Sequence, residues 1–307
     1  TNLSMSFDLF SPKVLDAVDQ ATMLFCRETM DTVTGDLNTA LDRLRELLRL
    51  GLPRGDAVQL LAKEVRRIFA DPMRAFRIAV TETSRAMHGG QMLAAKESGV
   101  KLMVHIGDTA KRYDPMVIRE LLPLLEPGDI ITHLFTANPG GVLGADGKLV
   151  PEAREVADRG VWLDTAHGRM NFGFEVGKRV LDQGLVPHCI STDLTIPGRL
   201  NTVHSLVEMM ARFLGLGFPL EQVIAMVTIN PARAIGVQDR LGPLGVGRQA
   251  DVSVVEVRSG RWTVYDAVGD SLRIEHAVVP VLAVKRGKVF EPEWGPHPWG
   301  WEPEPAQ

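Results

Sequence analysis

The chain has 307 residues, of which 45% are hydrophobic and 23% are charged, an ordinary balance for a globular protein of about two domains. The formal net charge of −4 gives no reason to expect a nucleic-acid partner or a membrane surface. No apolar stretch approaches the ~20 residues that a membrane helix needs. The two cysteines, Cys26 and Cys189, lie far apart, which argues against a disulfide framework and favours a cytoplasmic protein.

The first part of the chain has the pattern of amphipathic helices. Leucines recur at three- and four-residue spacing from Leu37 to Leu48, and Gly51 follows as a stop signal. A second apolar face runs from Val58 to Ile68 and ends before Pro72. No alternating or β-branched run occurs before residue 100, so we predict a helical domain over residues 1–98.

From residue 101 short apolar strands alternate with amphipathic helices. This alternation predicts a parallel sheet, because a helix supplies the crossover that parallel strands require. We therefore expect an α/β region, half of a TIM-type barrel with a (βα)4 arrangement, over residues 99–236. The predicted strands span 101–107, 129–135, 161–168 and 188–194, and the predicted helices span 114–128, 151–160, 174–184, 202–217 and 219–236.

The last part of the chain has a different pattern. Two β-rich stretches, 250–266 and 277–290, predict a small β module over residues 237–290, with a turn at Ser259-Gly260. The tail, residues 291–307, is rich in Pro, Trp and Glu, and we expect it to be extended.

A residue able to bind metal stands at the end of each predicted strand: His105, His133, His167 and Asp193. The carboxyl ends of parallel strands meet at one edge of a sheet or barrel, where catalytic groups gather. Imidazole and carboxylate groups suit Zn²⁺ or another divalent metal, which makes a bound water nucleophilic near neutral pH. Asp193 could bind the metal through one oxygen and act as general base through the other.

The motifs "MVHIGD", "DIITHLF", "LDTAHG", "CISTDL", "TINPARAIG" and "LGPLGVGRQADVSVVE" resemble the later part of the amidohydrolase superfamily. Over residues 100–290 the resemblance is closest to the dihydroorotase-like deacetylases, which act on N-acyl amino and hydroxy acids. It implies metal-dependent hydrolysis of an N-acyl or O-acyl bond in a small molecule. It also implies that His105, His133 and Asp193 bind the metal, that Asp193 is catalytic, and that His167 contacts the substrate. By the same likeness, the β module begins half of a β-sandwich.

The chain departs from that family in one respect. Such enzymes open with a His-x-His pair on their first strand, and the sequence contains none. His88 and Lys96 lie in helical sequence and are poor substitutes. We therefore expect impaired hydrolysis and a half-barrel with two open edges. Either the amino-terminal helices cover the opening or two chains pair edge to edge as a homodimer that closes the barrel, and we favour the dimer.

The leading segment resembles another family. Residues 5–100, with "IAVTETSRAMHGGQ", resemble the helical part of tailed-phage head-morphogenesis proteins, although Val80 stands where that family has Arg. A generic helical domain explains the same pattern. The alternative to an enzyme is thus a structural phage-type protein fused to an inactive barrel remnant, and a third interpretation is a joined reading frame without selected function.

Overall fold

The structure is a computed structural model that describes residues 99–107 and 118–292; predictions for the helical domain and the tail lie outside the described residues. The chain divides into two compact units, and the elements below belong to the second. The first unit comprises Thr1–Leu102 with Ala110–Val117, and the second Met103–Thr109 with Ile118–Gln307.

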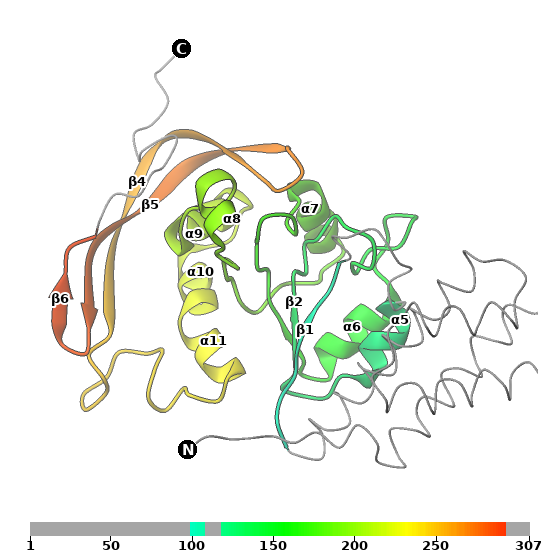
Figure 1. Ribbon diagram of the computed structural model, residues 1–307, viewed down its shortest axis with the longest axis horizontal. Helices are drawn as coiled ribbons and strands as arrows, with labels where there is room; N and C mark the ends of the chain where they lie inside the picture. Colours follow the sequence, from blue (N-terminus) through cyan, green and yellow to red (C-terminus); the bar gives the residue numbers. More distant parts are fainter. Residues whose placement is uncertain (1–98, 108–117, 293–307) are drawn as a thin grey trace, which may run out of the picture. The chain divides into compact units, whose positions relative to one another are not determined.

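A parallel sheet of three short strands forms the centre of the site region (Figure 1). The strands are β1 (Met103–His105), β2 (Ile130–Thr132) and β3 (Trp162–Leu163), in the order β1-β2-β3. Both pairings are parallel, as the alternation of strands and helices predicted. Ile131 and Leu163 are paired in this sheet and both are buried. Burial of their apolar side chains fixes the register of the two strands, because a shift by one residue would turn these side chains to the other face.

The predicted fourth strand is reduced to a single bridge. Cys189 pairs with Asp164 in parallel, and no longer strand forms around it. His188 and Cys189 both donate their backbone N–H groups to the Leu163 carbonyl, so the chain leaves the regular ladder there. The prediction of a fourth strand over residues 188–194 was therefore wrong in extent, although its parallel direction was right.

The helices between the strands follow the apolar periodicity of the sequence. Helix α6 (Pro151–Asp158) begins at a proline, whose missing N–H is no loss at a first helical position. Val156 on α6 and Val180 on α7 (Phe174–Asp182) are fully buried. The helices preceding and following the sheet strands are α5 (Ile118–Leu121), the 3₁₀ turn η2 (Leu122–Leu124), α6 (Pro151–Asp158), α7 (Phe174–Asp182), α8 (Ile196–Asn201) and α9 (Leu206–Gly215).

One predicted helix is two. The stretch 219–236 forms α10 (Leu220–Val227) and α11 (Ile229–Ala234), which are separated at Thr228. Thr228 has φ −125° and ψ −86°, outside the helical region. Pro231 explains the break, because its ring would collide with the carbonyl of Val227 in a continuous helix and it cannot donate a backbone hydrogen bond.

The β module is an antiparallel sheet in the order β4-β5-β6. Its strands are β4 (Val252–Tyr265), β5 (Ser271–Lys285) and β6 (Lys288–Phe290). The predicted turn at Ser259-Gly260 was wrong: β4 runs through it, with a register shift between Ser259 and Trp262. A β-bulge uses the same small, permissive residues as a turn, so the sequence signal was misassigned.

The turn of this hairpin lies at Asp266, which also joins the sheet to α7. Its Oδ1 accepts backbone N–H bonds from Val268, Gly269 and Asp270, and its Oδ2 accepts one from Phe174. The carboxylate thereby caps the first turn of α7, where free N–H groups favour a negative charge. Helix α9 packs on β5 through a close approach at Gly215, where a Cβ would lie 2.4 Å from Ile274.

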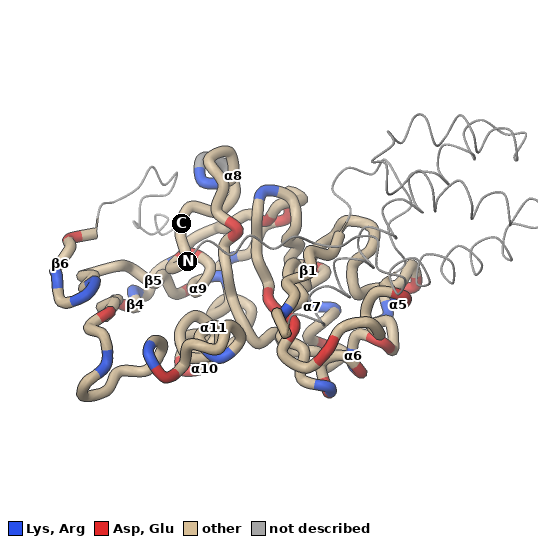
Figure 2. The backbone as a smooth tube through the Cα atoms, turned by 60° about the horizontal axis from the view of Figure 1, so that its bottom comes forward, with Lys and Arg blue, Asp and Glu red and all other residues tan. Residues whose placement is uncertain are grey.

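Acidic and basic residues are interspersed along the described chain (Figure 2). This distribution agrees with the small net charge of the sequence. Within the described residues, no helix has both the length and the apolar character needed to cross a membrane.

Candidate metal site at the strand ends

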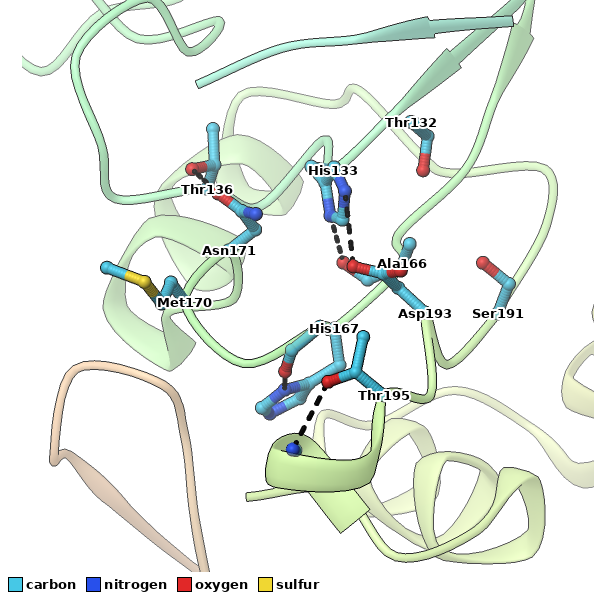
Figure 3. Close-up of polar contacts among 12 residues, drawn as sticks. Thr132, His133, Thr136, Ala166, His167, Met170, Asn171, Ser191, Asp193 and Thr195 are labelled. Carbon is cyan, nitrogen blue, oxygen red and sulfur yellow. Dashed lines mark hydrogen bonds and ion pairs between the residues drawn. The ribbon is translucent and has the colours of Figure 1, made fainter. Parts of the chain in front are cut away.

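Three of the four predicted site residues come together at the carboxyl ends of the strands. His105 ends β1, His133 directly follows β2, and Asp193 follows the bridge at Cys189. Figure 3 shows the side chains of His133 and Asp193 directed toward each other. The rings of His105 and His133 meet edge to face, with centroids 4.2 Å apart and planes at 61°. The parallel register places His105 opposite Thr132, so that His133 emerges one residue beyond it.

His133 is held in one orientation by its backbone and by its ring. It is only 2% exposed, and its φ of 70° lies in the left-handed region that residues other than glycine rarely adopt. Its Nδ1 lies 2.7 Å from the carbonyl oxygen of Ala166, so Nδ1–H donates and Nε2 carries the lone pair. Burial lowers the pKa of His133, and the neighbouring His105 lowers it further. The imidazole is therefore neutral near pH 7, as a metal ligand must be.

Asp193 presents a carboxylate to that lone pair. Its Oδ2 lies 3.8 Å from His133 Nε2, and its side chain is 45% exposed. Asp193 also has a left-handed backbone, with φ 45°. Such strain costs of order 1–3 kcal/mol and gathers at functional sites. With His133 neutral, two acceptor atoms face each other, an arrangement that a cation between them would stabilise.

Gly168 lies against both of these side chains. A Cβ built on it would lie 2.5 Å from Asp193 Oδ2 and 3.5 Å from His133 Cε1. Its φ of 57° is also left-handed, and its N–H donates to the Thr192 carbonyl. The absence of a side chain at Gly168 therefore lets the Asp193 carboxylate approach the His133 imidazole. The sequence analysis did not identify this role of Gly168.

His167 lies beneath this site and is completely buried. Its ring stacks on Phe172, with centroids 4.7 Å apart and planes at 13°, and its Nδ1–H donates to the Gly168 carbonyl. Among the described residues, Nε2 has no hydrogen-bond partner. Burial, followed by the charge of Arg212, lowers the pKa of His167 to about 3. At neutral pH the imidazole is therefore uncharged, with its one proton on Nδ1 and directed at the Gly168 carbonyl. The predicted contact of His167 with substrate stays a prediction.

This low pKa predicts a loss of stability in acid. An unfolded histidine binds its proton near pH 6.5, whereas folded His167 does so only near its pKa of about 3, so stability falls as the pH drops through this interval. Between pH 7 and pH 5 we expect the contribution of His167 to the free energy of unfolding to fall by about 2 kcal/mol. Urea unfolding of the wild type and His167→Asn at both pH values measures it. An equal pH dependence in both proteins would contradict it.

Asp164 is a further buried acid, which the sequence patterns did not single out. It follows β3, is 3% exposed, and its Oδ2 accepts hydrogen bonds from Thr132 Oγ1 (2.7 Å), Ser191 Oγ (2.8 Å) and the Ala166 N–H (3.3 Å). Burial raises the pKa of Asp164, against the effect of these hydrogen bonds. An acidic residue inside the apolar run "VWLDTAHG" was the available signal.

The donors at this site fit part of a divalent-metal site. The distance of 3.8 Å between His133 Nε2 and Asp193 Oδ2 is below the sum of two metal–ligand bonds, roughly 4.0–4.3 Å, so one ion can touch both atoms. The Nδ1–H bond to a carbonyl is the usual outer-shell support of a metal-ligating histidine. Within residues 99–107 and 118–292, however, no three His, Cys, Asp or Glu side chains gather closely enough to hold an ion.

The chain is similar to several known proteins. It is 35% identical over 190 residues to a deacetylase of Agrobacterium fabrum and 34% identical over 192 residues to a deacetylase of Brucella anthropi, each match covering 62% of this chain. These matches cover 45% and 46% of the relatives, so the chain spans about half the length of the curated relatives it matches.

Two solved structures share its fold. A dihydroorotase matches with a TM-score of 0.56 and 31% identity, over 65% of this chain and 53% of that one. An adenine deaminase matches with a TM-score of 0.62 and 24% identity, over 80% and 67% of the two chains, which shows the fold alone.

The comparisons give no evidence for a phage head-morphogenesis segment. The model of the amidohydrolase family matches residues 74–288, and this match begins inside the segment for which that likeness was predicted. It covers more than two thirds of the chain and every residue of the site described above. The chain belongs to the amidohydrolase family.

Proposed function

We propose that the chain contributes the strand-end part of a metal-dependent active site that hydrolyses an N-acyl or O-acyl bond in a small molecule. Family membership and the deacetylase relatives support this reaction class. The observation that carries the proposal is the pair of facing acceptor atoms, His133 Nε2 and Asp193 Oδ2. Imidazole and carboxylate groups suit a divalent cation, Zn²⁺ or another, which is the partner we propose for them.

The residues of the site have different proposed roles. His133 and Asp193 would hold the metal. His105, which the sequence predicted as a further ligand, contacts the His133 ring but does not complete a group of three around one ion in the described residues. A bound divalent ion supplies Lewis-acid polarisation of the acyl carbonyl and acidifies water. Asp193, partly exposed, takes the proton of the attacking water as the new C–O bond forms. It returns that proton to the leaving nitrogen or oxygen as the acyl bond breaks.

In the 307-residue chain alone we expect this activity to be weak. The sequence contains no His-x-His pair, and a catalytic zinc site ordinarily has three protein ligands. Loss of outer-shell partners alone costs 10–100-fold, so we expect turnover at least ~10²-fold below that of a complete relative.

The test is acetate release from N-acetyl amino acids by protein purified without chelator, with and without added Zn²⁺. We expect slow release that requires the metal and stops with a chelator. A rate of acetate release that neither added Zn²⁺ nor a chelator changes would overturn the proposed reaction. So would the absence of acetate release at any metal concentration. Turnover equal to that of the Agrobacterium deacetylase assayed beside it would contradict the expected impairment.

The open edge of β1 leads to a further expectation. Within the described residues β1 pairs only with β2, and Met103 on β1 is 60% exposed. An apolar strand edge favours pairing with another chain. We therefore expect a homodimer in which the free edge of β1 in each chain pairs with the other chain. Light scattering coupled to size exclusion measures the mass; a monodisperse monomer with a cooperative melting transition would exclude the dimer.

A further inference from the structure

Asp164 connects three separate segments of the chain through one oxygen atom. Thr132, at the end of β2, and Ser191, in the segment after the Cys189 bridge, both donate their hydroxyl groups to Oδ2. The third donor is the backbone N–H of Ala166, two residues beyond Asp164 itself. Oδ1, by contrast, is buried without a hydrogen-bond partner in the described part of the chain.

Each of these donors is linked to a residue of the proposed metal site, either by its place in the sequence or by a hydrogen bond. Thr132 immediately precedes His133, and Ser191 stands two residues before Asp193 (Figure 3). Ala166 is the residue whose carbonyl accepts the Nδ1–H of His133. One carboxylate oxygen thereby joins the segment bearing the imidazole, the segment bearing the acid, and the carbonyl that fixes the imidazole tautomer.

We infer that Asp164 is a positioning residue, which orients His133 and Asp193 toward each other by holding their segments through its Oδ2. The inference rests on the proposed function for its catalytic consequence, whereas the orientation of the His133 ring can be tested without any metal. Outer-shell groups of this kind fix ligand orientation and commonly contribute 10–100-fold to metal affinity.

The arrangement of the bonds predicts which substitutions are tolerated. All three bonds reach Oδ2, so the amide oxygen of an asparagine can accept them in its place, while its NH₂ group takes the position of the unpartnered Oδ1. Asp164→Asn thus keeps the connection and removes the charge. Asp164→Ala removes the connection and leaves the hydroxyl groups of buried Thr132 and half-buried Ser191 without their acceptor, at about 1–3 kcal/mol for the buried one.

Asp266 offers a matched control. It is a carboxylate buried to a similar degree, it accepts four backbone N–H bonds, and it has no bond to His133, Ala166 or Asp193. Asp266→Ala therefore reports the general cost of losing a buried carboxylate in this fold.

The experiment uses the full chain labelled with ¹⁵N-histidine, without added metal, and follows the His133 ring by long-range ¹H–¹⁵N correlation spectra assigned with His133→Gln. The wild type is expected to show one fixed tautomer with the proton on Nδ1. Asp164→Ala should show exchange between tautomers, whereas Asp164→Asn and Asp266→Ala should keep the wild-type pattern. If Asp164→Ala does not fold, the double variant Thr132→Val/Ser191→Ala replaces it and should show the same exchange.

A fixed Nδ1–H tautomer in Asp164→Ala or in the double variant would overturn the inference. So would loss of the tautomer in Asp164→Asn, which would assign the effect to charge, or in Asp266→Ala, which would assign it to general loosening. Zn²⁺ titration of the same proteins is the second readout, with affinity lowered ~10–100-fold in Asp164→Ala and retained in Asp164→Asn. If the wild type binds no Zn²⁺, the proposed function fails, while the ring spectra still decide the role of Asp164.

Discussion

Replacing Gly168 with alanine is expected to lower both Zn²⁺ affinity and metal-dependent hydrolysis about 10²-fold, the scale of a 1 Å misplacement of reacting groups. The new methyl group would lie 2.5 Å from Asp193 Oδ2, well inside van der Waals contact. The carboxylate must therefore move away from His133 Nε2, and the two acceptors no longer face one ion. Calorimetric titration with Zn²⁺ and acetate release measure the two losses.

The control separates crowding from backbone strain. Gly184 also has a left-handed backbone, with φ 78°, but a Cβ at this position would lie 3.8 Å from its nearest neighbour, an atom of Arg154. Gly184→Ala and Gly168→Ala should both lose ~1–2 kcal/mol of stability from the strained conformation. Only Gly168→Ala should lose metal affinity. Equal affinities in the two variants would show that Gly168 has no part in the site.

Substitution of Asp193 by asparagine is expected to abolish the metal-dependent part of the hydrolysis, a loss of roughly 10²–10⁴-fold if the carboxylate is the general base. The amide keeps the shape of the side chain but cannot accept the proton of water, and it binds a divalent cation more weakly than a carboxylate does. The loss should therefore appear in kcat and in Zn²⁺ affinity. Initial rates across a range of N-acetyl amino acid concentrations, at saturating metal, separate kcat from KM.

An exposed aspartate away from the site supplies the matched control. Asp158 ends α6 and faces solvent, so Asp158→Asn should leave rates and metal affinity unchanged. If Asp193→Asn behaves like Asp158→Asn, the acid at the strand end has neither of the roles proposed for it.

The sequence predicted the parallel strands and the residues at their ends because both follow from local pattern. Alternating apolar strands and amphipathic helices require parallel crossovers, and this placed His105 and His133 on one edge, where their rings meet. The lengths of the strands and helices were less predictable. Cys189 makes only a bridge, since its backbone N–H bonds to Leu163 outside a regular ladder, and Pro231 divides a helix whose apolar periodicity continues across it.

The supporting residues of the site could not be predicted, because their roles depend on contacts between distant segments. Asp164 binds hydroxyl groups 32 and 27 residues away. Gly168 is required by the position of Asp193. Residue type alone does not locate the left-handed φ angles of His133 and Asp193, although both residue types adopt this region more often than most. The prediction of a turn at Ser259-Gly260 was wrong for another reason. A bulge and a turn favour the same residues, and only the pairing of β4 with β5 distinguishes them.

The central claim is that His133 and Asp193 hold one divalent ion between them, and calorimetric titration of the metal-free chain with Zn²⁺ tests it most directly. The expected isotherm has one site per chain, with affinity at least ~10²-fold lower in Asp193→Asn and in His133→Gln, since a lost ligand should cost no less than a lost outer-shell partner. An isotherm that both substitutions leave unchanged, or no binding by the wild type, would contradict the claim.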